Sequence, residues 1–312
     1  MLLVREELRR TATPGAHALS IGVFDGVHGG HRMLIARMQA EAAARGLTGG
    51  VVTFHPHPVT VVRPDVPFSY IESLERRVEL LRDLGVAFVS VLTFTSELQQ
   101  VSAADFTRLL VEEAGLRVLV VGEDFRLGRG GEGTVDRLRA IGEEQGFEVV
   151  AVPLLPDDDG RDRISSTRVR AALAEGRMDE VQALLGRPYA IRGPVLHGDQ
   201  RGRVIGFPTL NVGVSPDRAL PPHGVYVTRA LIDDRMVQAV TNIGTRPTFD
   251  GRTTTVETHL LDFEGDLYGH VVTVELMQLL RGEQKFDGLE ALKAQIALDV
   301  ERTRAWFAGA GA

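Results

Sequence analysis

The sequence predicts an α/β protein that combines a doubly wound parallel sheet with a C-terminal antiparallel β-barrel and a terminal helix. Two patterns indicate this class. Strand-like and helical segments alternate up to about residue 152, as in parallel sheets with crossover helices. From Tyr189 onward, short β-like runs are separated by glycine and proline, which is typical of barrels. The 312 residues are enough for two domains, and we expect them to span 1–186 and 187–312.

Each element of the first half is predicted from its periodicity and its end signals. Ser102 and Asp105 have the spacing of a capping box at a helix start. Ligands of such sheets bind at the carboxyl ends of the strands. The expected strands are 18–21, 50–54, 86–94, 117–121 and 147–152, and the expected helices are 30–45, 73–84, 102–114 and 135–145.

The second half begins with two short helices that end at LLGRPY. The β-like runs that follow are AIRGPVLHG, GVYVTRALI, MVQAVTNIG, TTTVETHLL and HVVTVELMQLL. A last helix, about 288–306, carries Leu289, Leu292, Ile296 and Val300 on one stripe, which we expect to pack against the core.

The composition excludes several classes of protein. There is no cysteine, so disulfides and thiolate chemistry are ruled out. Residues 1–186 hold 21 Arg and no Lys against 27 Asp and Glu, and the net charge of the chain is −7. This balance argues against nucleic-acid binding. No apolar run approaches the length of a membrane span, so we expect a cytoplasmic protein whose partners are small molecules.

The first candidate site is GVFDGVHGGH, residues 22–31, at the end of the first strand. His28 ends the turn and His31 lies in the first helical turn, where backbone amides converge and favour anions. Imidazole donors there can stabilise the charge on an α-phosphate during nucleotidyl transfer. The alternatives, together about equally weighted, are a structural cap or a zinc site shared with His55 and His57.

The second candidate is ISSTRVR, residues 164–170. Hydroxyl groups followed by arginines at a helix start can hold nucleotide phosphates. Taken alone, an N-cap with a solvated arginine face is the commoner explanation. The pairing with HGGH on an α/β sheet resembles the nucleotidyltransferase superfamily. By contrast, GRGGEG at 128–133 matches a dinucleotide pattern, but EDFRL separates it from the strand, which favours a flexible loop that can close over a ligand.

The third candidate is GRVIGFPTLN, residues 202–211, in the second half. Thr209 and Asn211 are two residues apart, so on an extended segment both can bind Mg²⁺ and its phosphate oxygens. The alternative is a polar turn. Glu257 in VETHLL can act as a general base on a substrate hydroxyl, although an exposed strand glutamate is the more common explanation.

Over nearly its whole length the chain resembles the bacterial bifunctional riboflavin kinase/FAD synthetase family. The motifs that carry the resemblance are GVFDGVHGGH, TFHPHP, GEDFRLG, ISSTRVR, LLGRPY, GRVIGFPTLN, PPHGVY, NIGTRPTF, VETHLLDF and LYGHVVTVEL. The resemblance implies that the C-terminal domain phosphorylates riboflavin with MgATP to give FMN. It implies that the N-terminal domain then transfers AMP from ATP to FMN, which gives FAD and pyrophosphate.

The resemblance also implies roles for individual residues. His28 and His31 would stabilise the adenylyl transition state, and Glu257 would take the proton of the ribityl hydroxyl. Nucleotide contacts in the first domain would come from Gly22, Phe24, Asp25, Asp124, Ser165, Ser166, Thr167 and Arg168. Those of the kinase domain would come from Gly206, Phe207, Pro208, Thr209 and Asn211, and the last two of these would hold Mg²⁺.

Two departures from the family pattern are visible, and three alternatives stay open. Val23 stands where many members have Asn, and GRVI replaces GRGL or GRTL. The alternatives are a nucleotidyltransferase with one activity, a zinc-binding or flavin-sensing module without catalysis, and an aminoacyl-tRNA synthetase, against which the acidic first half argues. Phe54 and Phe125 can stack on the flavin ring or belong to the core.

Overall fold

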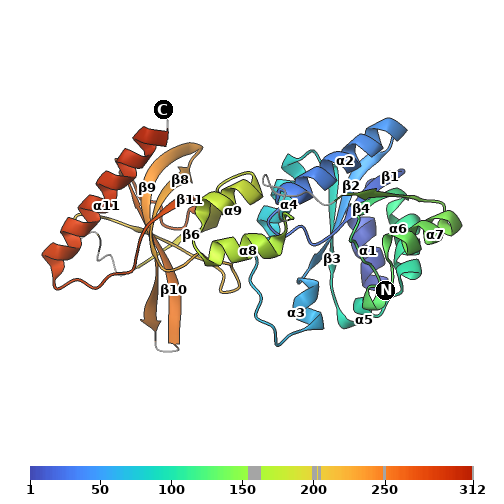
Figure 1. Ribbon diagram of the computed structural model, residues 1–312, viewed down its shortest axis with the longest axis horizontal. Helices are drawn as coiled ribbons and strands as arrows, with labels where there is room; N and C mark the ends of the chain where they lie inside the picture. Colours follow the sequence, from blue (N-terminus) through green and yellow to red (C-terminus); the bar gives the residue numbers. More distant parts are fainter. Residues whose placement is uncertain (154–162, 199–201, 203–204, 249–250, 311–312) are drawn as a thin grey trace. The chain divides into compact units, whose positions relative to one another are not determined.

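The computed structural model describes residues 1–153, 163–198, 202, 205–248 and 251–310, without the side chains of 246–248, 251–253 and 310. Two compact units are present, Met1–Ser166 and Thr167–Ala312. The first is a parallel sheet with helices on its faces, and the second contains a closed barrel (Figure 1). The fold class predicted from the sequence is confirmed.

The first unit is built on five parallel strands in the order β3-β2-β1-β4-β5. Its strands are β1 (His17–Ile21), β2 (Thr48–His55), β3 (Phe88–Thr93), β4 (Leu116–Gly122) and β5 (Glu148–Val152). Its helices are α1 (Leu2–Thr11), α2 (Gly29–Arg45), α3 (Pro58–Val62), α4 (Leu74–Asp83), α5 (Ser96–Gln99), α6 (Ala103–Ala114) and α7 (Val135–Gln145), with the short 3₁₀ turn η1 (Arg129–Gly131).

Two apolar clusters cover the two faces of this sheet, because successive side chains of a strand point to opposite sides. Leu19 and Val52 face α1, α6 and α7, whereas Ala18 and Val51 face α2 and α4. All four are fully buried. Helices on both faces leave the carboxyl edge of the strands as the place for a site.

The helix starts follow the predicted capping chemistry. Ser102 accepts a hydrogen bond from the amide of Asp105 at the start of α6, and Ser73 and Thr134 cap α4 and α7 in the same way. Helices α1, α3 and α5 were not predicted from the sequence. The last two are only five and four residues long, too short for a helical period to show. In α1 the buried face consists of Val4, Glu7 and Leu8 alone.

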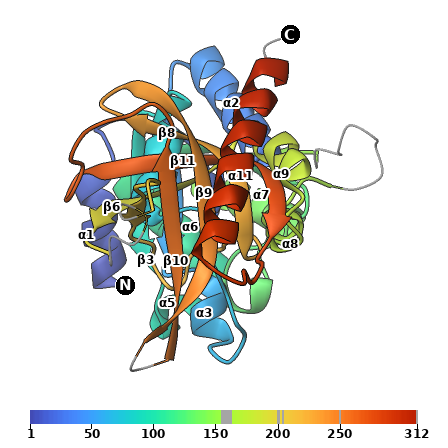
Figure 2. The same cartoon turned by 90° about the vertical axis from the view of Figure 1, so that its left-hand side faces the viewer.

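The second unit is a closed barrel with the strand order β10-β7-β6-β11-β8-β9 (Figure 2). Its strands are β6 (Tyr189–Leu196), β7 (Leu210–Val212), β8 (Gly224–Ile232), β9 (Arg235–Thr248), β10 (Gly251–Leu260) and β11 (Val271–Gly282). Helices α8 (Ser166–Ala174) and α9 (Met178–Leu185) precede it, and α11 (Leu289–Ala310) packs on β8 and β9. All neighbouring strands are antiparallel.

The buried face of helix α11 differs from the apolar stripe that was predicted for it. Leu289 is 51% exposed, although Val300 packs against the cluster around Val225. The fully shielded positions of the helix are instead Asp299 and Thr303. Asp299 accepts hydrogen bonds from Arg281 of β11 at 2.8–3.2 Å, so an ion pair occupies part of the helix–barrel contact.

The division between the two compact units falls after Ser166, earlier in the chain than the domain boundary predicted near Gly186. Helices α8 and α9 belong to the second unit, where α9 packs on β6 and β11. The amino-acid composition does not change where the first unit ends, so the sequence does not indicate which of the two units contains these helices.

Candidate functional site

A strained turn follows β1 at the carboxyl edge of the parallel sheet. Phe24 and Val27 have φ angles of +55° and +42°, a region that non-glycine residues rarely adopt and that is most costly for a β-branched side chain. Both side chains are almost fully buried, at 1% exposure. Burial therefore holds the turn in a conformation that the isolated chain would avoid.

His28 and His31 lie together where this turn enters α2. Their rings are stacked with centroids 3.6 Å apart, and the Phe24 ring lies 5.1 Å from that of His31. His28 caps the helix, since its Nδ1 accepts a hydrogen bond from the backbone amide of His31 at 3.4 Å. The two imidazoles thus stand at the positive end of the helix.

His31 has the properties of a group prepared for a ligand. Its Nδ1 is shielded from solvent and has no hydrogen-bond partner among the described residues, and a buried polar atom left in this way is costly. Burial, followed by the charges of His28 and Arg77, lowers the pKa of His31 well below its ordinary value of 6.5. The neutral imidazole is therefore the form present at neutral pH.

The ISSTRVR segment contacts the histidine turn. The Ser166 hydroxyl donates to the backbone carbonyl of Asp25 at 2.8 Å. A Cβ on Gly30 would lie 3.5 Å from the Ile164 carbonyl oxygen. The Asp25 carboxylate itself is buried and accepts hydrogen bonds from the amides of Ile71 and Glu72 at 3.1 Å, so it anchors the loop before α4.

The other predicted phosphate contacts lie in different surroundings. Asp124, after β4, is exposed and forms an ion pair with Arg163, next to Ile164. Ser165 is partly buried and Thr167 is exposed. Within the second unit, Arg168 donates to Glu180 of α9 at 2.9 Å.

The histidines of TFHPHP do not complete a zinc site. His57 caps α3 by accepting from the Val59 amide, and its ring packs 4.2 Å from that of Phe68. Within the described part of the chain, no three His, Asp or Glu side chains are grouped as metal ligands. The zinc alternative therefore has no support from the described geometry.

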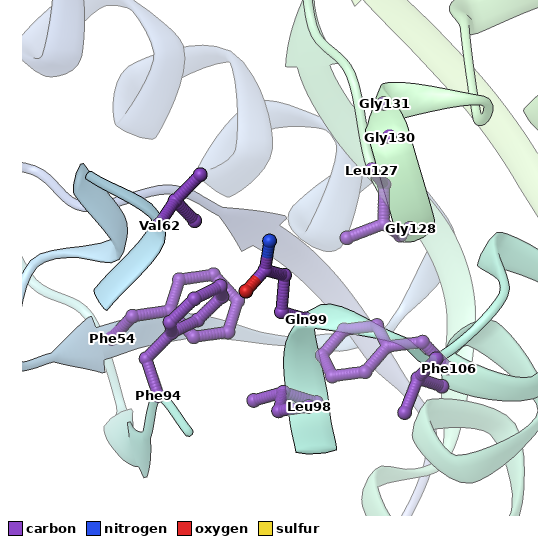
Figure 3. A pocket seen from close by; sticks show the side chains of 11 residues that line it. Phe54, Val62, Phe94, Leu98, Gln99, Phe106, Leu127, Gly128, Gly130 and Gly131 are labelled. Atoms are coloured by element: carbon purple, nitrogen blue, oxygen red, sulfur yellow. The ribbon is translucent and has the colours of Figure 1, made fainter. Parts of the chain in front are cut away.

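An aromatic cavity of about 250 Å³ opens near the ends of β2 and β3. Figure 3 shows the rings of Phe54 and Phe94 on one side and that of Phe106 on the other, with Gln99 between them. GRGGEG supplies part of the wall: a bridge between Leu127 and Gly133 closes it into a compact turn rather than an open loop. Phe125 packs against the core and is not among the lining residues.

The barrel places Asn211 and Glu257 side by side. They are register partners between β7 and β10, and Asn242 of β9 lies opposite Glu257 on its other side. Register partners share one face of a sheet, so an amide, a carboxylate and an amide form a row across three strands. Asn242 was not predicted as a site residue, although it is the first residue of the NIGTRPTF motif.

The GFPT segment runs beside this row. The Pro208 carbonyl accepts a hydrogen bond at 2.8 Å from Nδ1 of His259, which lies two residues beyond Glu257 and hence on the same face. The Phe207 ring packs on the same histidine at 5.5 Å. Gly206 has a φ of +87°, which glycine adopts without strain. Arg203 and Val204 of GRVI lie outside the described residues.

Thr209 and Asn211 stand in a glycine-lined cradle. A Cβ at Gly198 would come within 2.2 Å of the Asn211 amide nitrogen, and one at Gly202 would lie 3.3 Å from the Thr209 hydroxyl. A second cavity, of about 290 Å³, opens beside Thr209 and is lined by residues that include Phe263, Asp266 and Tyr268. The two glycines thus let these oxygen-bearing side chains pack closely against the backbone.

The fold and these two constellations define a two-site phosphate-transferring enzyme. A family profile described as FAD synthetase matches residues 10–168, and one described as Riboflavin kinase matches residues 185–307. The chain belongs to the bifunctional riboflavin kinase/FMN adenylyltransferase family, with its FAD synthetase module first and its riboflavin kinase module second.

Curated relatives with that same name match along most of their length. The protein of Escherichia coli K12 is 40% identical over 93% of this chain and 92% of its own. That of Pseudomonas fluorescens is 43% identical over 92% and 91%, and that of Bacillus subtilis 34% over 98% and 95%.

A solved structure shares the whole fold. The crystal structure of a protein described as a macrolide-efflux protein from Streptococcus pneumoniae superposes with a TM-score of 0.87 at 32% identity, covering 96% of this chain and 97% of the other.

Among the residues described for the present chain, no helix combines the length and apolar character that a membrane crossing needs.

Proposed function

We propose that the turn at His28 and His31 is where AMP is transferred from ATP to FMN. An oxygen of the FMN phosphate bonds to the α-phosphorus of ATP while the bond to the bridging oxygen breaks and pyrophosphate leaves. Negative charge gathers on the α-phosphate oxygens in this step. The histidine N–H groups and the first amides of α2 are donors fixed beforehand at that position.

The aromatic cavity is proposed as the site of the FMN isoalloxazine. Its rings offer flat apolar surfaces on which a tricyclic ring can stack, and the Gln99 amide can hydrogen-bond to the polar edge of a flavin. The cavity lies at the carboxyl edge of the sheet, as the histidine turn does, where ligands of parallel sheets bind. Its position after β2, beside that turn, supports binding of the acceptor substrate.

The remaining adenylyltransferase contacts are proposed with unequal support. Ser166 has the strongest, because its hydroxyl touches the histidine turn. Ser165, Thr167 and Arg168 follow as ligands of the leaving phosphates, and Asp124 as a nucleotide contact. Asp25, together with the backbone of Gly22 and Phe24, would shape the nucleotide site, and the hydrogen bonds of its carboxylate to loop amides support an anchoring role.

We propose that Glu257 is the general base of the kinase reaction. It takes the proton of the riboflavin 5′-hydroxyl as the hydroxyl oxygen bonds to the γ-phosphorus of another ATP, while the bond from that phosphorus to the bridging oxygen breaks and ADP leaves. The base is needed because that hydroxyl is a poor nucleophile at neutral pH. Gly206, Phe207 and Pro208 would bring the nucleotide to the same face. The cavity beside Thr209 would take the kinase ATP, since it is continuous with this segment.

The oxygen donors of Thr209 and Asn211 fit Mg²⁺, which prefers hard oxygen ligands and keeps several positions for water and phosphate. Gly198 and Gly202 let these two side chains lie directly against the backbone, which limits their movement. When bound, the ion would neutralise charge on the transferred phosphate.

A cytoplasmic location stays a prediction.

The observation that carries this assignment is the buried Nδ1 of His31, which has no hydrogen-bond partner among the described residues and lies beside His28 at the start of α2. The test is to incubate the protein with riboflavin and MgATP, with a control lacking Mg²⁺, and to resolve riboflavin, FMN and FAD over time. FMN should appear before FAD. FMN without FAD would contradict the adenylyltransferase assignment, and the absence of both products would contradict the whole proposal.

A further inference from the structure

Arg77 of α4 is a buried cation close to the adenylyltransferase site. It is 0% exposed and is the largest fully buried side chain of the described residues. Both of its hydrogen bonds go to backbone carbonyls rather than to a carboxylate, and its Nε is buried without a hydrogen-bond partner in the described part of the protein. A guanidinium in such surroundings is costly, so its presence calls for a function.

The two carbonyls belong to the ends of neighbouring strands. One guanidinium nitrogen donates to Val23 at 2.8 Å, just beyond β1, and the other donates to Phe54 at 3.3 Å, in β2. The Thr53 hydroxyl donates to the same Val23 carbonyl at 3.0 Å. Arg77 therefore ties the start of the histidine turn to the strand that carries the aromatic cavity.

The residue that follows Val23 is the strained Phe24, whose ring packs on His31. Rotation of the Val23–Phe24 peptide is the simplest way for the turn to relax, and it would break the bonds from Arg77 and Thr53. Charged hydrogen bonds of this kind are among the stronger ones in proteins. The structure thus shows both a strained conformation and the side chain that opposes its relaxation.

We propose that Arg77 is a positioning residue for adenylyl transfer: its guanidinium holds the Val23–Val27 turn in the strained form that presents His28 and His31, and its charge acts on their site. This inference rests on the function proposed above for those histidines. The charge matters because the first unit has no lysine, so a buried arginine can add positive potential where phosphates bind.

Arg77 has titratable neighbours on three surrounding segments of the chain. Burial is the largest effect and lowers the pKa of Arg77, whereas Asp25 from the turn, Tyr70 from the loop before α4 and Glu75 from α4 act to raise it. Facing His31 are His28 and Arg77, both of which disfavour the imidazolium. Removal of the Arg77 charge should consequently move protonation of His31 to higher pH.

The test compares Arg77→Met, Arg77→Lys and the unchanged full-length protein. Riboflavin kinase activity, FMN adenylyltransferase activity and the pH profile of the latter are measured on each. Arg77→Met should lower the kcat of FAD synthesis about 10- to 100-fold, the effect of losing charged hydrogen bonds, with kinase activity unchanged. The acid limb of its profile should move to higher pH, while Arg77→Lys should restore most of the rate and the normal limb.

If Arg77→Met does not fold, Thr53→Val tests the positioning of the turn separately from the effect of the Arg77 charge. It removes the second donor to the Val23 carbonyl without changing any charge, and it should lower kcat for FAD synthesis about 3- to 10-fold with an unmoved acid limb. Full FAD synthesis in both Arg77→Met and Thr53→Val would overturn the inference, as would an Arg77→Lys protein as slow as Arg77→Met. Absence of FAD synthesis in the unchanged protein would instead overturn the proposed function.

Discussion

Replacement of Gly30 by alanine should separate activity from stability in the adenylyltransferase unit. Gly30 lies in the first turn of α2, directly between the two histidines in sequence. A Cβ built there would lie 3.2 Å from Cε1 and 3.3 Å from Nδ1 of His28, and 3.5 Å from the Ile164 carbonyl oxygen. The first two contacts are tighter than ordinary van der Waals distances, so the imidazole must move.

The expected loss of kcat depends on how far the His28 imidazole is displaced. A shift of about 0.2–0.5 Å would relieve the contact, and a misplacement of about 1 Å can cost about 100-fold in rate. On that scale Gly30→Ala should lower kcat for FAD synthesis about 3- to 10-fold. Stacking against His31 at 3.6 Å resists the movement. Alanine also favours the helix by up to about 1 kcal/mol, so thermal stability should not fall.

The assay measures FAD formation from supplied FMN, FMN formation from riboflavin, and the midpoint of thermal unfolding. Gly309→Ala is the matched control, because Gly309 is also helical and a Cβ there would meet no atom within 4 Å. Slower FAD synthesis with unchanged kinase activity and an equal or higher midpoint is the expected result. A Gly30→Ala protein with normal FAD synthesis would refute the argument that His28 must hold its present position.

Four further predictions address the two sites. His28→Ala should lower FAD synthesis about 100-fold, as expected for a lost transition-state donor, while FMN formation continues. Glu257→Gln should abolish FMN formation and leave FAD synthesis from added FMN, and a parallel loss of both would refute the division into two sites. Phe94→Leu should raise the KM for FMN about 2- to 10-fold, the worth of one aromatic stack, with the KM for ATP unchanged and Phe125→Leu as the control. Because the pKa of His31 is lowered below 6.5, FAD synthesis should stay at its plateau at pH 6.5 and decline only at lower pH in a pH–rate profile. The unfolded chain takes up this proton near pH 6.5 and the folded one does not, so stability is complete above that pH and declines below it.

The pairing of HGGH with ISSTRVR shows what a sequence can predict about a site. Each motif alone had an ordinary explanation, and the Ser166–Asp25 hydrogen bond shows that the two segments meet in space. Both segments were assigned to one nucleotide through the family resemblance, and neither motif by itself predicts the contact. The roles of these residues remain predictions.

The aromatic cavity and the amide–carboxylate–amide row were harder to foresee. Phe54 was weighed as a flavin contact and lines the cavity, whereas Phe94 and Phe106, which also line it, were not predicted as site residues. Asn242 joins Glu257 only through the β9–β10 register. A one-residue slip would turn it to the opposite face, and the sequence alone does not determine that register.

By itself, the sequence determined the parallel sheet followed by the barrel, the helix caps, and the residue types available for phosphate chemistry, because periodicity and capping are local properties. Only the tertiary structure decided that α8 and α9 accompany the barrel, that Asp299 and Thr303 rather than Leu289 are buried in α11, and that Arg77 lies beneath the histidine turn. Arg77 has the appearance of a surface residue in the charged stretch LERRVELLRD. Its burial depends on the order of strands far apart in the chain, and no local pattern records that order.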